Sequence, residues 1–272
     1  MSSKAASDRL PIGLFDSGVG GLTVLKALQA ELPGESYLYL GDTARVPYGT
    51  RSPETVSRYA VQATELLIER GIKALVVACN TASAFALEAI RDAHPELPVF
   101  GVIQPGAQAA VAASERGHIA VIATEGTVRG GAYQSAIHAL APDTEVSALA
   151  CPMLVALAEE GWTDGDIVTA ILRRYLDPLF AAPAADTLVL GCTHFPVLGD
   201  SIRAVVPDNV KLVDSAATTA SVVAAALRQR AVEESAGQHF LVTDNVERFR
   251  QSALQFLGRE LAPESIELVD IR

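Results

Sequence analysis

The sequence predicts an α/β fold of two similar lobes, each with a parallel sheet flanked by helices. Short apolar runs rich in β-branched residues recur along the chain, and each is followed by polar or glycine-rich residues and then by a helical stretch. These runs do not alternate in polarity, which is typical of strands with both faces buried. Two early segments also have counterparts further along the chain, which indicates a repeated unit.

Seven apolar runs are the predicted strands. In chain order they span residues 12–15, 37–40, 74–78, 99–103, 119–123, 188–190 and 211–213. A further strand and helix are expected within residues 239–257, and we expect them to pack against the first lobe.

Helices are expected between the strands. Residues 53–70 place apolar side chains at helical spacing. Ser52 can cap the start of this helix, Pro53 suits its first turn and Gly71 can end it. Two alanine-rich stretches, 107–113 and 216–226, are also expected to be helical, because alanine has the highest helix propensity.

The internal repeat is clearest around two cysteines. The run KALVVACNTASAFAL at residues 73–87 resembles DTLVLGCTHFPVL at residues 186–198: an apolar strand, a small residue, a cysteine and then polar residues that open a helix. A looser pair is residues 12–25 and residues 119–133, each a strand that turns into a polar, glycine-containing loop. The repeat therefore predicts two lobes of similar construction.

The repeat also predicts where the chain passes between the lobes. The boundary is expected near Gln104-Pro105-Gly106 and the return near Asp214-Ser215. Residues 1–103 and 213–272 would then form the first lobe, and residues 104–212 the second.

Composition argues against several classes of partner. The chain of 272 residues has a formal net charge of -11 and a pI near 4.9, which disfavours nucleic-acid and anionic-membrane partners. No apolar stretch typical of a secretion signal precedes Pro11, and the three cysteines have no regular spacing. We therefore expect a cytoplasmic protein with a short loose N-terminal tail, reduced thiols, and no nucleic-acid or membrane partner.

Polar and thiol side chains follow several predicted strands at their carboxyl ends, where parallel sheets bind ligands. They are Asp16, Asp42, Cys79, Thr124, Cys192 and Asp214. A helix N-terminus stabilises a thiolate, so the pKa of Cys79 and Cys192 is expected to fall from about 8.5 toward neutrality. A free cysteine is more often a small buried hydrophobe, but two in matching positions of a repeat favour a catalytic role.

The residues after each cysteine can bind a carboxylate. Asn80 and Thr81 follow the first cysteine, and Thr193 and His194 follow the second. Amide, hydroxyl and helix N–H groups together suit an anion, although the same side chains could cap the helices, and both roles are compatible. His194 titrates near neutrality and could take or return a proton.

The loop DSGVGG, residues 16–21, first suggests a dinucleotide site. The spacing of G-x-G-x-x-G fails, because its third glycine would fall at Thr23. The glycines instead allow a tight turn that exposes N–H groups to an anion, and Asp16 and Ser17 would face the ligand. The alternative is that Asp16 only caps the helix expected near Leu22.

The remaining features of the sequence do not predict further catalytic or metal sites. The sequence has no Walker A loop and no HExxH zinc motif, no metal site is expected, and no lysine lies in a recognisable pyridoxal phosphate site. Cys151 begins a predicted helix without a strand before it, so we interpret it as a structural thiol. Glu159 and Glu160 would form the solvated end of that helix, or one of them would line the cleft.

Seven motifs in chain order resemble those of glutamate racemases in the aspartate/glutamate racemase superfamily: LFDSGVGGLTV, GDTARVPYG, ACNTASA, ATEGTV, CPMLVALAEEGW, GCTHFPVL and LVDSA. The resemblance covers nearly the whole chain from Ile12 to about Ala216, and the ordered set of motifs is far more specific than any one motif. The resemblance implies two α/β lobes related by pseudo-twofold symmetry, glutamate bound between them and no cofactor. Small departures from the family pattern affect packing more than catalysis. They are Ala123, Gly130, Ala156 and Ala158.

The resemblance also implies residue roles. Cys79 would deprotonate D-glutamate and Cys192 would deprotonate L-glutamate, so that one base serves each face of Cα. Asp16 would assist Cys79, His194 would assist Cys192, and Glu159 matches a further acidic position near the second cysteine. The implied substrate-binding residues are Asp16, Ser17, Tyr48, Gly49, Asn80, Thr81, Thr124, Thr193 and His194.

Three other functions stay open. Another two-cysteine enzyme, such as an aspartate racemase or a maleate-isomerase-like enzyme, is the nearest, although His194 after the second cysteine favours glutamate. A two-lobed amino-acid-binding protein would need no catalytic thiols, and a Cys/His acyl-transfer hydrolase would need one nucleophile rather than two. The resemblance further implies supply of D-glutamate for peptidoglycan, and we expect a homodimer whose arrangement the sequence does not reveal.

Overall fold

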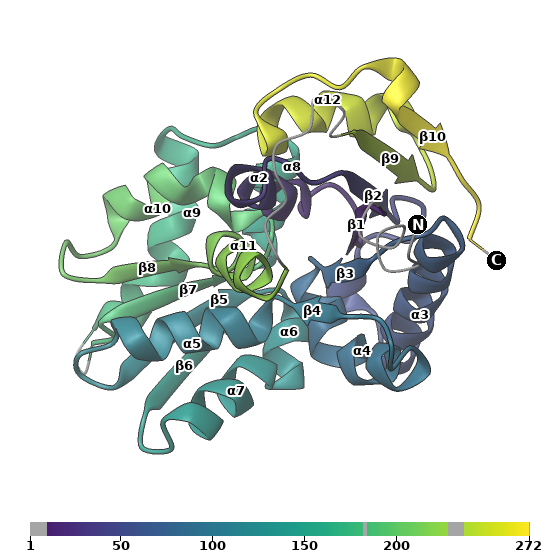
Figure 1. Ribbon diagram of the computed structural model, residues 1–272. Helices are drawn as coiled ribbons and strands as arrows, with labels where there is room; N and C mark the ends of the chain where they lie inside the picture. The colour runs from purple at the N-terminus through teal and green to yellow at the C-terminus, as the bar shows by residue number, and fades with distance from the viewer. Residues whose placement is uncertain (1–9, 182–183, 228–236, 272) are drawn as a thin grey trace.

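The computed structural model describes residues 10–181, 184–227 and 237–271, and the N-terminal tail expected from the sequence lies outside these ranges. The described strands form two parallel sheets (Figure 1). In spatial order, the first sheet consists of β10 (Ile266–Leu268), β9 (Gln238–Val242), β2 (Tyr37–Gly41), β1 (Ile12–Asp16), β3 (Ala74–Val77) and β4 (Val99–Gly101). The second consists of β6 (Glu145–Ala150), β5 (His118–Ala123), β7 (Thr187–Gly191) and β8 (Lys211–Asp214).

The two sheets share one strand order. β2, β1, β3 and β4 of the first sheet correspond to β6, β5, β7 and β8 of the second, and their pairings are parallel. The strand before Cys79 thus corresponds to the strand before Cys192. This correspondence confirms the predicted fold of two similar α/β units. β9 and β10 extend the first sheet beyond β2.

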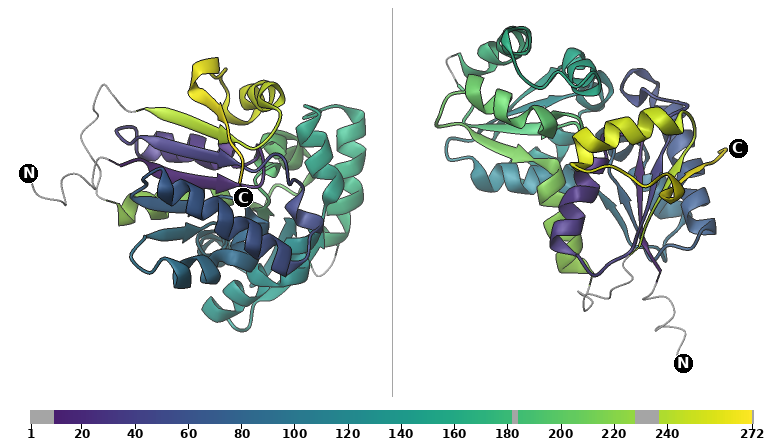
Figure 2. Two further views of the ribbon diagram at one scale, coloured as in Figure 1. Left: turned by 90° about the vertical axis from the view of Figure 1, so that its right-hand side faces the viewer. Right: turned by 90° about the horizontal axis from the view of Figure 1, so that it is seen from above.

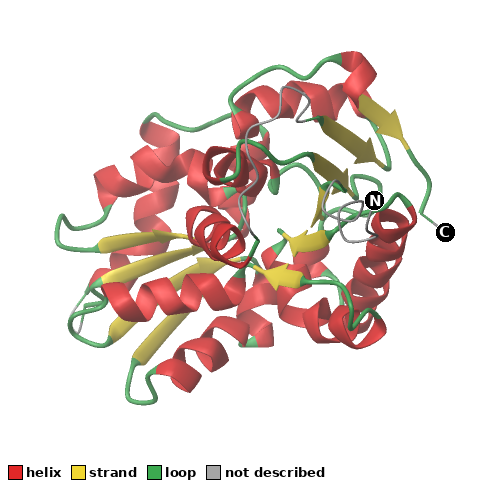
Figure 3. Cartoon of the chain, viewed as in Figure 1, coloured by secondary structure: helices red, strands yellow, loops and turns green. Residues whose placement is uncertain are grey.

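Helices alternate with the strands and cover both faces of each sheet (Figure 3). The α-helices are α2 (Leu22–Glu31), α3 (Pro53–Glu69), α4 (Asn80–Ala93), α5 (Ile103–Ala113), α6 (Glu125–Gly130), α7 (Ala132–Leu140), α8 (Pro152–Glu159), α9 (Asp166–Leu176), α10 (Gly199–Val205), α11 (Ser215–Ala226) and α12 (Val246–Leu257). The 3₁₀ turns are η1 (Tyr48–Thr50), η2 (Asp177–Phe180), η3 (Phe195–Leu198) and η4 (Pro263–Ser265). Within the described ranges, no helix combines the length and apolar character needed to cross a bilayer.

Local sequence signals explain where several elements begin and end. Ser52 Oγ accepts a hydrogen bond from Thr55 N at 3.3 Å, Pro53 opens α3, and Gly71 follows the helix with φ +81°. Both alanine-rich stretches are helical, within α5 and α11. The strand and helix predicted within residues 239–257 are β9 and α12.

Some strand predictions are wrong. The run 99–103 is a strand only over Val99–Gly101, because α5 begins at Ile103. The sequence pattern misses β6 and β10, which lie at sheet edges and are only partly buried, so their residues do not form a fully apolar run. β8 is also an edge strand and is partly exposed rather than fully buried.

Alternate side chains of the central strands enter different cores, because successive residues of a strand point to opposite faces. Leu14 of the first sheet and Val121 and Val189 of the second share one core, so a single apolar cluster joins the two halves. The opposite faces pack separately, against α3 and α4 in the first half and against α8, α9 and α10 in the second. Cys79 and Cys192 belong to those two separate cores, which is a further sign that their positions correspond.

The joint between the halves is helical. α5 follows the edge strand β4, α11 follows the edge strand β8, and α11 packs against both α2 and α5. In Figure 1, α2 and α11 lie between the two sheets. Two further views show β9, β10 and α12, in yellow-green and yellow, next to the strands of the first sheet (Figure 2). This arrangement leaves the carboxyl ends of both sets of central strands near one another, as the contacts below show.

Candidate active site

Residues at the carboxyl ends of the strands meet between the two halves. Asp16 ends β1, Thr124 follows β5, and the two cysteines come just after β3 and β7. Thr81 Oγ1 of the first half lies 2.9 Å from Thr124 Oγ1 of the second, and Cys79 and Cys192 are near enough to interact electrostatically. Asp16, Cys79, Thr124 and Cys192 therefore lie close together between the two halves.

Cys79 is a buried thiol at the start of α4. It occupies the N-cap position, its Sγ accepts a hydrogen bond from Ala82 N at 3.5 Å, and Ser17 Oγ is also 3.5 Å away. The expected lowering of its pKa is wrong. Burial and the negative charge of Asp16 raise the pKa of Cys79 to about 12, because they outweigh the hydrogen bonds with Ser17 and Ala82. Cys79 is therefore a protonated thiol that can give a proton.

Asp16 offers an unpaired oxygen near Cys79. The residue is fully buried, its Oδ2 accepts a hydrogen bond from Gly18 N at 2.9 Å, and its Oδ1 has no hydrogen-bond partner in the described part of the chain. Burial raises the pKa of this carboxyl, although His194 and nearby backbone N–H groups partly oppose the rise. The N-cap of α2 is Gly21 and has no side-chain hydrogen bond, so Asp16 does not cap that helix. Its free oxygen suits an ammonium group or a thiol proton.

His194 joins Cys192 to Glu159. Its Nδ1 lies 3.8 Å from Cys192 Sγ, its Nε2 lies 3.1 Å from Glu159 Oε1, and its ring packs edge-on against Phe256. Burial would lower the pKa of His194, but hydrogen bonds and charge interactions with Cys192 and Glu159 outweigh it and raise the pKa to about 10. The imidazole is thus protonated at neutral pH and can stabilise a thiolate at Cys192. The residues after His194 form the 3₁₀ turn η3 rather than the α-helix expected there.

Glu159 lies at the end of α8 and contacts the site through His194. The hydrogen bond from His194 is the main reason that the pKa of Glu159 is lowered, although burial opposes it. Arg248 Nη2 of α12 lies 3.9 Å from the other carboxylate oxygen, Glu159 Oε2. The alternative that this end of α8 is only solvated is therefore wrong for Glu159. It fits Glu160, which is exposed.

Asn80 and the threonines near it join the two halves. Asn80 Oδ1 accepts a hydrogen bond from Tyr133 OH at 2.8 Å, while Asn80 Nδ2 is buried and has no partner among the described residues. Thr81 Oγ1 lies within hydrogen-bond distance of both Thr124 and Thr127, at 2.9 and 3.2 Å. Thr124 is also the N-cap of α6, so capping and a place in the site coexist at this residue.

Tyr48 and Gly49 enter the site as a turn. Tyr48 OH donates a hydrogen bond to Asp42 Oδ2 at 2.5 Å, and Thr243 donates to the other oxygen of Asp42 at 3.0 Å. A Cβ at Gly49 would lie 2.8 Å from Thr124 Cβ, so only glycine allows the turn to pack this closely against the second half. Asp42 therefore holds the turn in place through the Tyr48 side chain.

Gly20 is the point where the glycine-rich loop touches the second cysteine segment. A Cβ at this position would overlap Thr193 Oγ1 and lie 2.5 Å from His194 Nδ1. Thr23 Oγ1 also donates a hydrogen bond to Thr193 O at 3.1 Å. Sequence reasoning attributed this glycine to an anion-binding turn and missed its close approach to Thr193 and His194, which no local pattern signals.

Cys151 is a buried thiol outside these contacts. The expectation that no strand precedes it is wrong, because β6 ends at Ala150. Its Sγ lies 3.7 Å from Leu149 O, and burial raises its pKa to about 12. The interpretation as a structural thiol fits these surroundings. No group of three or more His, Cys, Asp or Glu side chains suited to a metal occurs within the residues that the structure describes.

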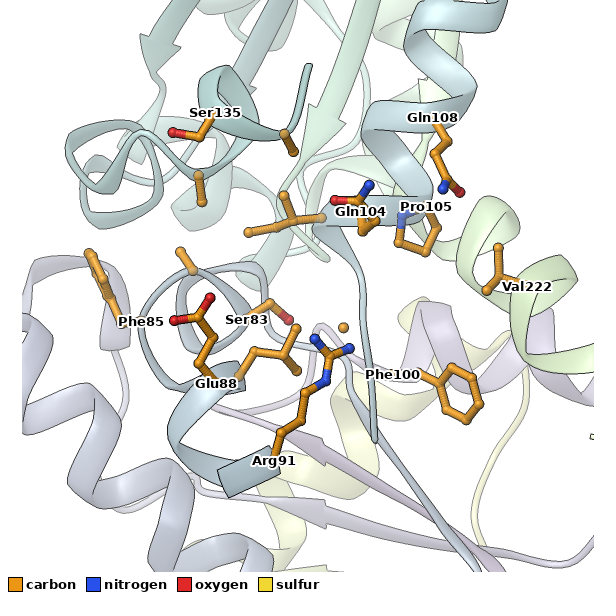
Figure 4. Close-up of a pocket in the computed structure, with 16 residues that line it drawn as sticks. Ser83, Phe85, Glu88, Arg91, Phe100, Gln104, Pro105, Gln108, Ser135 and Val222 are labelled. Carbon is orange, nitrogen blue, oxygen red and sulfur yellow. The ribbon is translucent and has the colours of Figure 1, made fainter. Parts of the chain in front are cut away.

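Several cavities lie near the junction of the halves. One of about 660 Å³ lies between α4 and the helices α5 and α7, with Arg91, Gln104 and Ser135 among its lining residues (Figure 4). None of the predicted site residues lines it. A smaller cavity of about 210 Å³ is lined by Gly18, Glu159 and Arg248 among others and adjoins the site. Glu159 and Arg248 also line a cavity of about 600 Å³ beside it.

Comparison with known proteins gives a consistent result. A family model described as Asp/Glu/Hydantoin racemase matches residues 21–223. The chain is 51% identical over 254 residues to a glutamate racemase of Geobacter metallireducens, with 92% of this chain and 93% of the relative covered. It is 45% identical over 265 residues to a glutamate racemase of Neisseria meningitidis, covering 96% of this chain and 97% of the relative.

Solved structures agree. The glutamate racemase of Francisella tularensis in complex with D-glutamate has a TM-score of 0.90 at 35% identity, covering 97% of this chain and 98% of that one. The Escherichia coli glutamate racemase, in complex with L-glutamate and the activator UDP-MurNAc-ala, has a TM-score of 0.79 at 30% identity, covering 97% and 99%. The aspartate racemase of Picrophilus torridus, at 15% identity and a TM-score of 0.56 over 81% of this chain and 95% of that one, shares the fold alone.

Proposed function

Given that the chain belongs to the aspartate/glutamate racemase family, we propose that it interconverts L- and D-glutamate by two-base proton transfer at Cα, without a cofactor. The observation that carries the proposal is the pair of buried cysteines that follow corresponding strands of two similar sheets, Cys79 after β3 and Cys192 after β7. The relatives that match this chain over nearly their full length are glutamate racemases, which supports glutamate as the substrate. The reaction makes the protein an isomerase.

Racemisation removes the Cα proton from one face and returns a proton to the other. For L-glutamate, a Cys192 thiolate takes the proton, the Cα–H bond breaks and its electron pair stays on Cα. The Cys79 thiol then gives its proton to the opposite face, which forms D-glutamate. This leaves Cys192 protonated and Cys79 as the thiolate, the state that accepts D-glutamate, so the reverse reaction uses the same groups with exchanged roles.

The unequal partners of the cysteines support this scheme. Cys79 is a protonated thiol, because its pKa is raised to about 12 by burial and by the charge of Asp16. His194 is an imidazolium at neutral pH and lies beside Cys192 Sγ. Cys79 would therefore supply the proton when L-glutamate is the substrate, and His194 would stabilise the thiolate of Cys192. Asp16 would assist Cys79 when that residue has to act as the base.

The remaining polar groups suit the charges of an amino acid. Asp16 Oδ1 and Asn80 Nδ2 are a buried acceptor and a buried donor without partners among the described residues, which suits an ammonium group and a carboxylate respectively. The other proposed substrate-binding residues are Ser17, Tyr48, Gly49, Thr81, Thr124, Thr193 and His194. Directed hydrogen bonds from such a site would stabilise the carbanion-like state, because little water remains to screen them.

The test is racemisation by purified protein without pyridoxal phosphate. Either enantiomer of glutamate, or of aspartate in a parallel series, is incubated with the protein, and the optical activity is followed by circular dichroism. We expect each glutamate enantiomer to approach the same racemic end point, while aspartate changes little. Activity on aspartate alone would overturn the substrate assignment, and binding of glutamate without racemisation would favour an amino-acid-binding protein.

The proposal extends to the role and state of the protein in the cell. We propose that the cytoplasmic enzyme supplies D-glutamate for peptidoglycan and works as a homodimer. The described cysteines are free thiols, which is compatible with a reducing compartment. Growth of a D-glutamate-requiring bacterium on expression of this chain would support the cellular role, and sedimentation of the purified protein would test the dimer.

A further inference from the structure

Tyr133 is a buried tyrosine of α7 that contacts both halves of the site. Its hydroxyl donates a hydrogen bond to Asn80 Oδ1, at the start of the helix that follows Cys79, at 2.8 Å. Its ring packs against Gly191, the last residue of the strand before Cys192, where an added Cβ would lie 3.0 Å from Tyr133 Cε2. A single side chain thus lies between the two cysteine-bearing segments.

The hydrogen bond from Tyr133 determines how the Asn80 side chain is oriented. An asparagine amide carries an acceptor oxygen on one side and two N–H donors on the other, so fixing the oxygen also fixes the nitrogen. Asn80 is buried, and its Nδ2 has no hydrogen-bond partner among the described residues. A buried donor without a partner costs free energy, and a ligand acceptor would remove that cost.

Tyr133 is suited to remain a donor throughout the working pH range. Burial is the main reason that its pKa is raised above the ordinary value, with Asp214 and Cys192 adding to the rise and Ser215 opposing it. The phenol therefore keeps its proton at neutral and mildly alkaline pH. Since Asn80 Oδ1 accepts that proton's hydrogen bond, the amide cannot rotate without losing it.

We infer that Tyr133 is a positioning residue for substrate binding: its hydroxyl holds the Asn80 amide so that Nδ2 faces a carboxylate of glutamate. The inference rests on the proposed function and names one residue that acts through another. Without the hydroxyl, the amide is free to turn over and present its oxygen, which would repel the carboxylate. The effect falls on binding of either enantiomer, because the carboxylates are not altered by the reaction.

The first test is Tyr133→Phe, which removes the hydroxyl and keeps the ring. We expect KM for both enantiomers to rise about 10- to 100-fold, the size of one lost hydrogen bond to a charged ligand, with kcat within about twofold. Tyr37→Phe is the matched control. Tyr37 is also buried and its hydroxyl donates to Leu28 O and Leu32 O, at the opposite end of β2 from the site. The control is expected to lower stability without changing KM.

A double-mutant cycle with Asn80→Ala separates positioning from general packing. If Tyr133 acts through Asn80, the KM increase caused by Tyr133→Phe disappears when Asn80 is already alanine. Asn80→Ala keeps the Tyr133 side chain and must by itself raise KM at least as much as Tyr133→Phe does. If Tyr133→Phe fails to fold, an unchanged KM in Asn80→Ala still overturns the inference.

Three results would overturn the inference while leaving the proposed function intact. They are an unchanged KM in Tyr133→Phe, equal effects of that substitution with and without Asn80, and a smaller KM increase in Asn80→Ala than in Tyr133→Phe. If the unaltered protein does not racemise glutamate, the proposed function fails, and the inference fails with it.

Discussion

Replacement of Glu159 by glutamine should move the alkaline limit of activity to lower pH. Glu159 Oε1 lies 3.1 Å from His194 Nε2. In the unaltered protein, Cys192 and Glu159 together overcome the effect of burial and raise the pKa of His194 from 6.5 to about 10. Glutamine keeps an oxygen that can accept the hydrogen bond but removes the negative charge. Since burial still favours the neutral ring, we expect the pKa of His194 to fall to roughly 8 to 9.

The size of the effect follows from the fraction of protonated His194. A group whose pKa is raised in the folded protein loses its proton as the pH rises through that value. At pH 9.5 an imidazole with a pKa of about 10 is about three-quarters protonated, whereas one with a pKa of about 8.5 is about one-tenth protonated. The kcat/KM of the variant for L-glutamate, divided by that of the unaltered protein, should therefore be about eightfold lower at pH 9.5 than at pH 7.

The assay is kcat/KM for L-glutamate between pH 6 and pH 10.5, followed by circular dichroism. Glu160→Gln is the matched control, because it removes the same charge from the adjacent exposed residue. The control should keep the alkaline limit of the unaltered protein. The reasoning is refuted if Glu159→Gln and Glu160→Gln have the same pH profile, since Glu159 would then not support protonation of His194.

Two further substitutions test the site. Gly20→Ala should reduce kcat/KM by about 100-fold or more, because its Cβ would displace Thr193 and His194. The control is Gly199→Ala, where a Cβ meets nothing within 4 Å, and it should change kcat/KM less than about twofold. Similar losses in both variants would count against the close contact at Gly20. Cys151→Ala should keep kcat/KM within about twofold while lowering the free energy of unfolding by about 1 kcal/mol in urea titration; a large loss of activity would contradict its structural role.

The fold was largely predictable from the sequence because its central strands are buried on both faces. Their apolar runs stand out, and the repeat around Cys79 and Cys192 indicates the shared strand order that the structure confirms. The edge strands β6 and β10 were not predictable in this way, because partial exposure leaves polar residues such as Ser147 among the apolar ones. The division at residues 103 and 104 stays a prediction.

The site was predictable as a set of residue types at strand ends, but not in its electrostatics. The pKa of Cys79 depends on burial and on Asp16, 63 positions earlier in the chain, and neither effect follows from a helix N-terminus alone. The contact of Tyr133 with Asn80 joins residues 53 positions apart, and no local pattern signals it. The sequence pattern left Glu159 either at a solvated helix end or lining the cleft, and only the family resemblance implied a catalytic position for it. Its contact with His194 required the folded chain.

The central claim is that each cysteine serves one face of Cα. The most direct test follows deuterium incorporation at Cα by NMR when each glutamate enantiomer is incubated in deuterated water with Cys79→Ser or Cys192→Ser. We expect neither variant to give net racemisation. Cys192→Ser should still exchange the Cα proton of D-glutamate through Cys79, and Cys79→Ser should still exchange that of L-glutamate through Cys192. Full racemisation by either variant, or the same enantiomer exchanged by both, would contradict the two-base scheme.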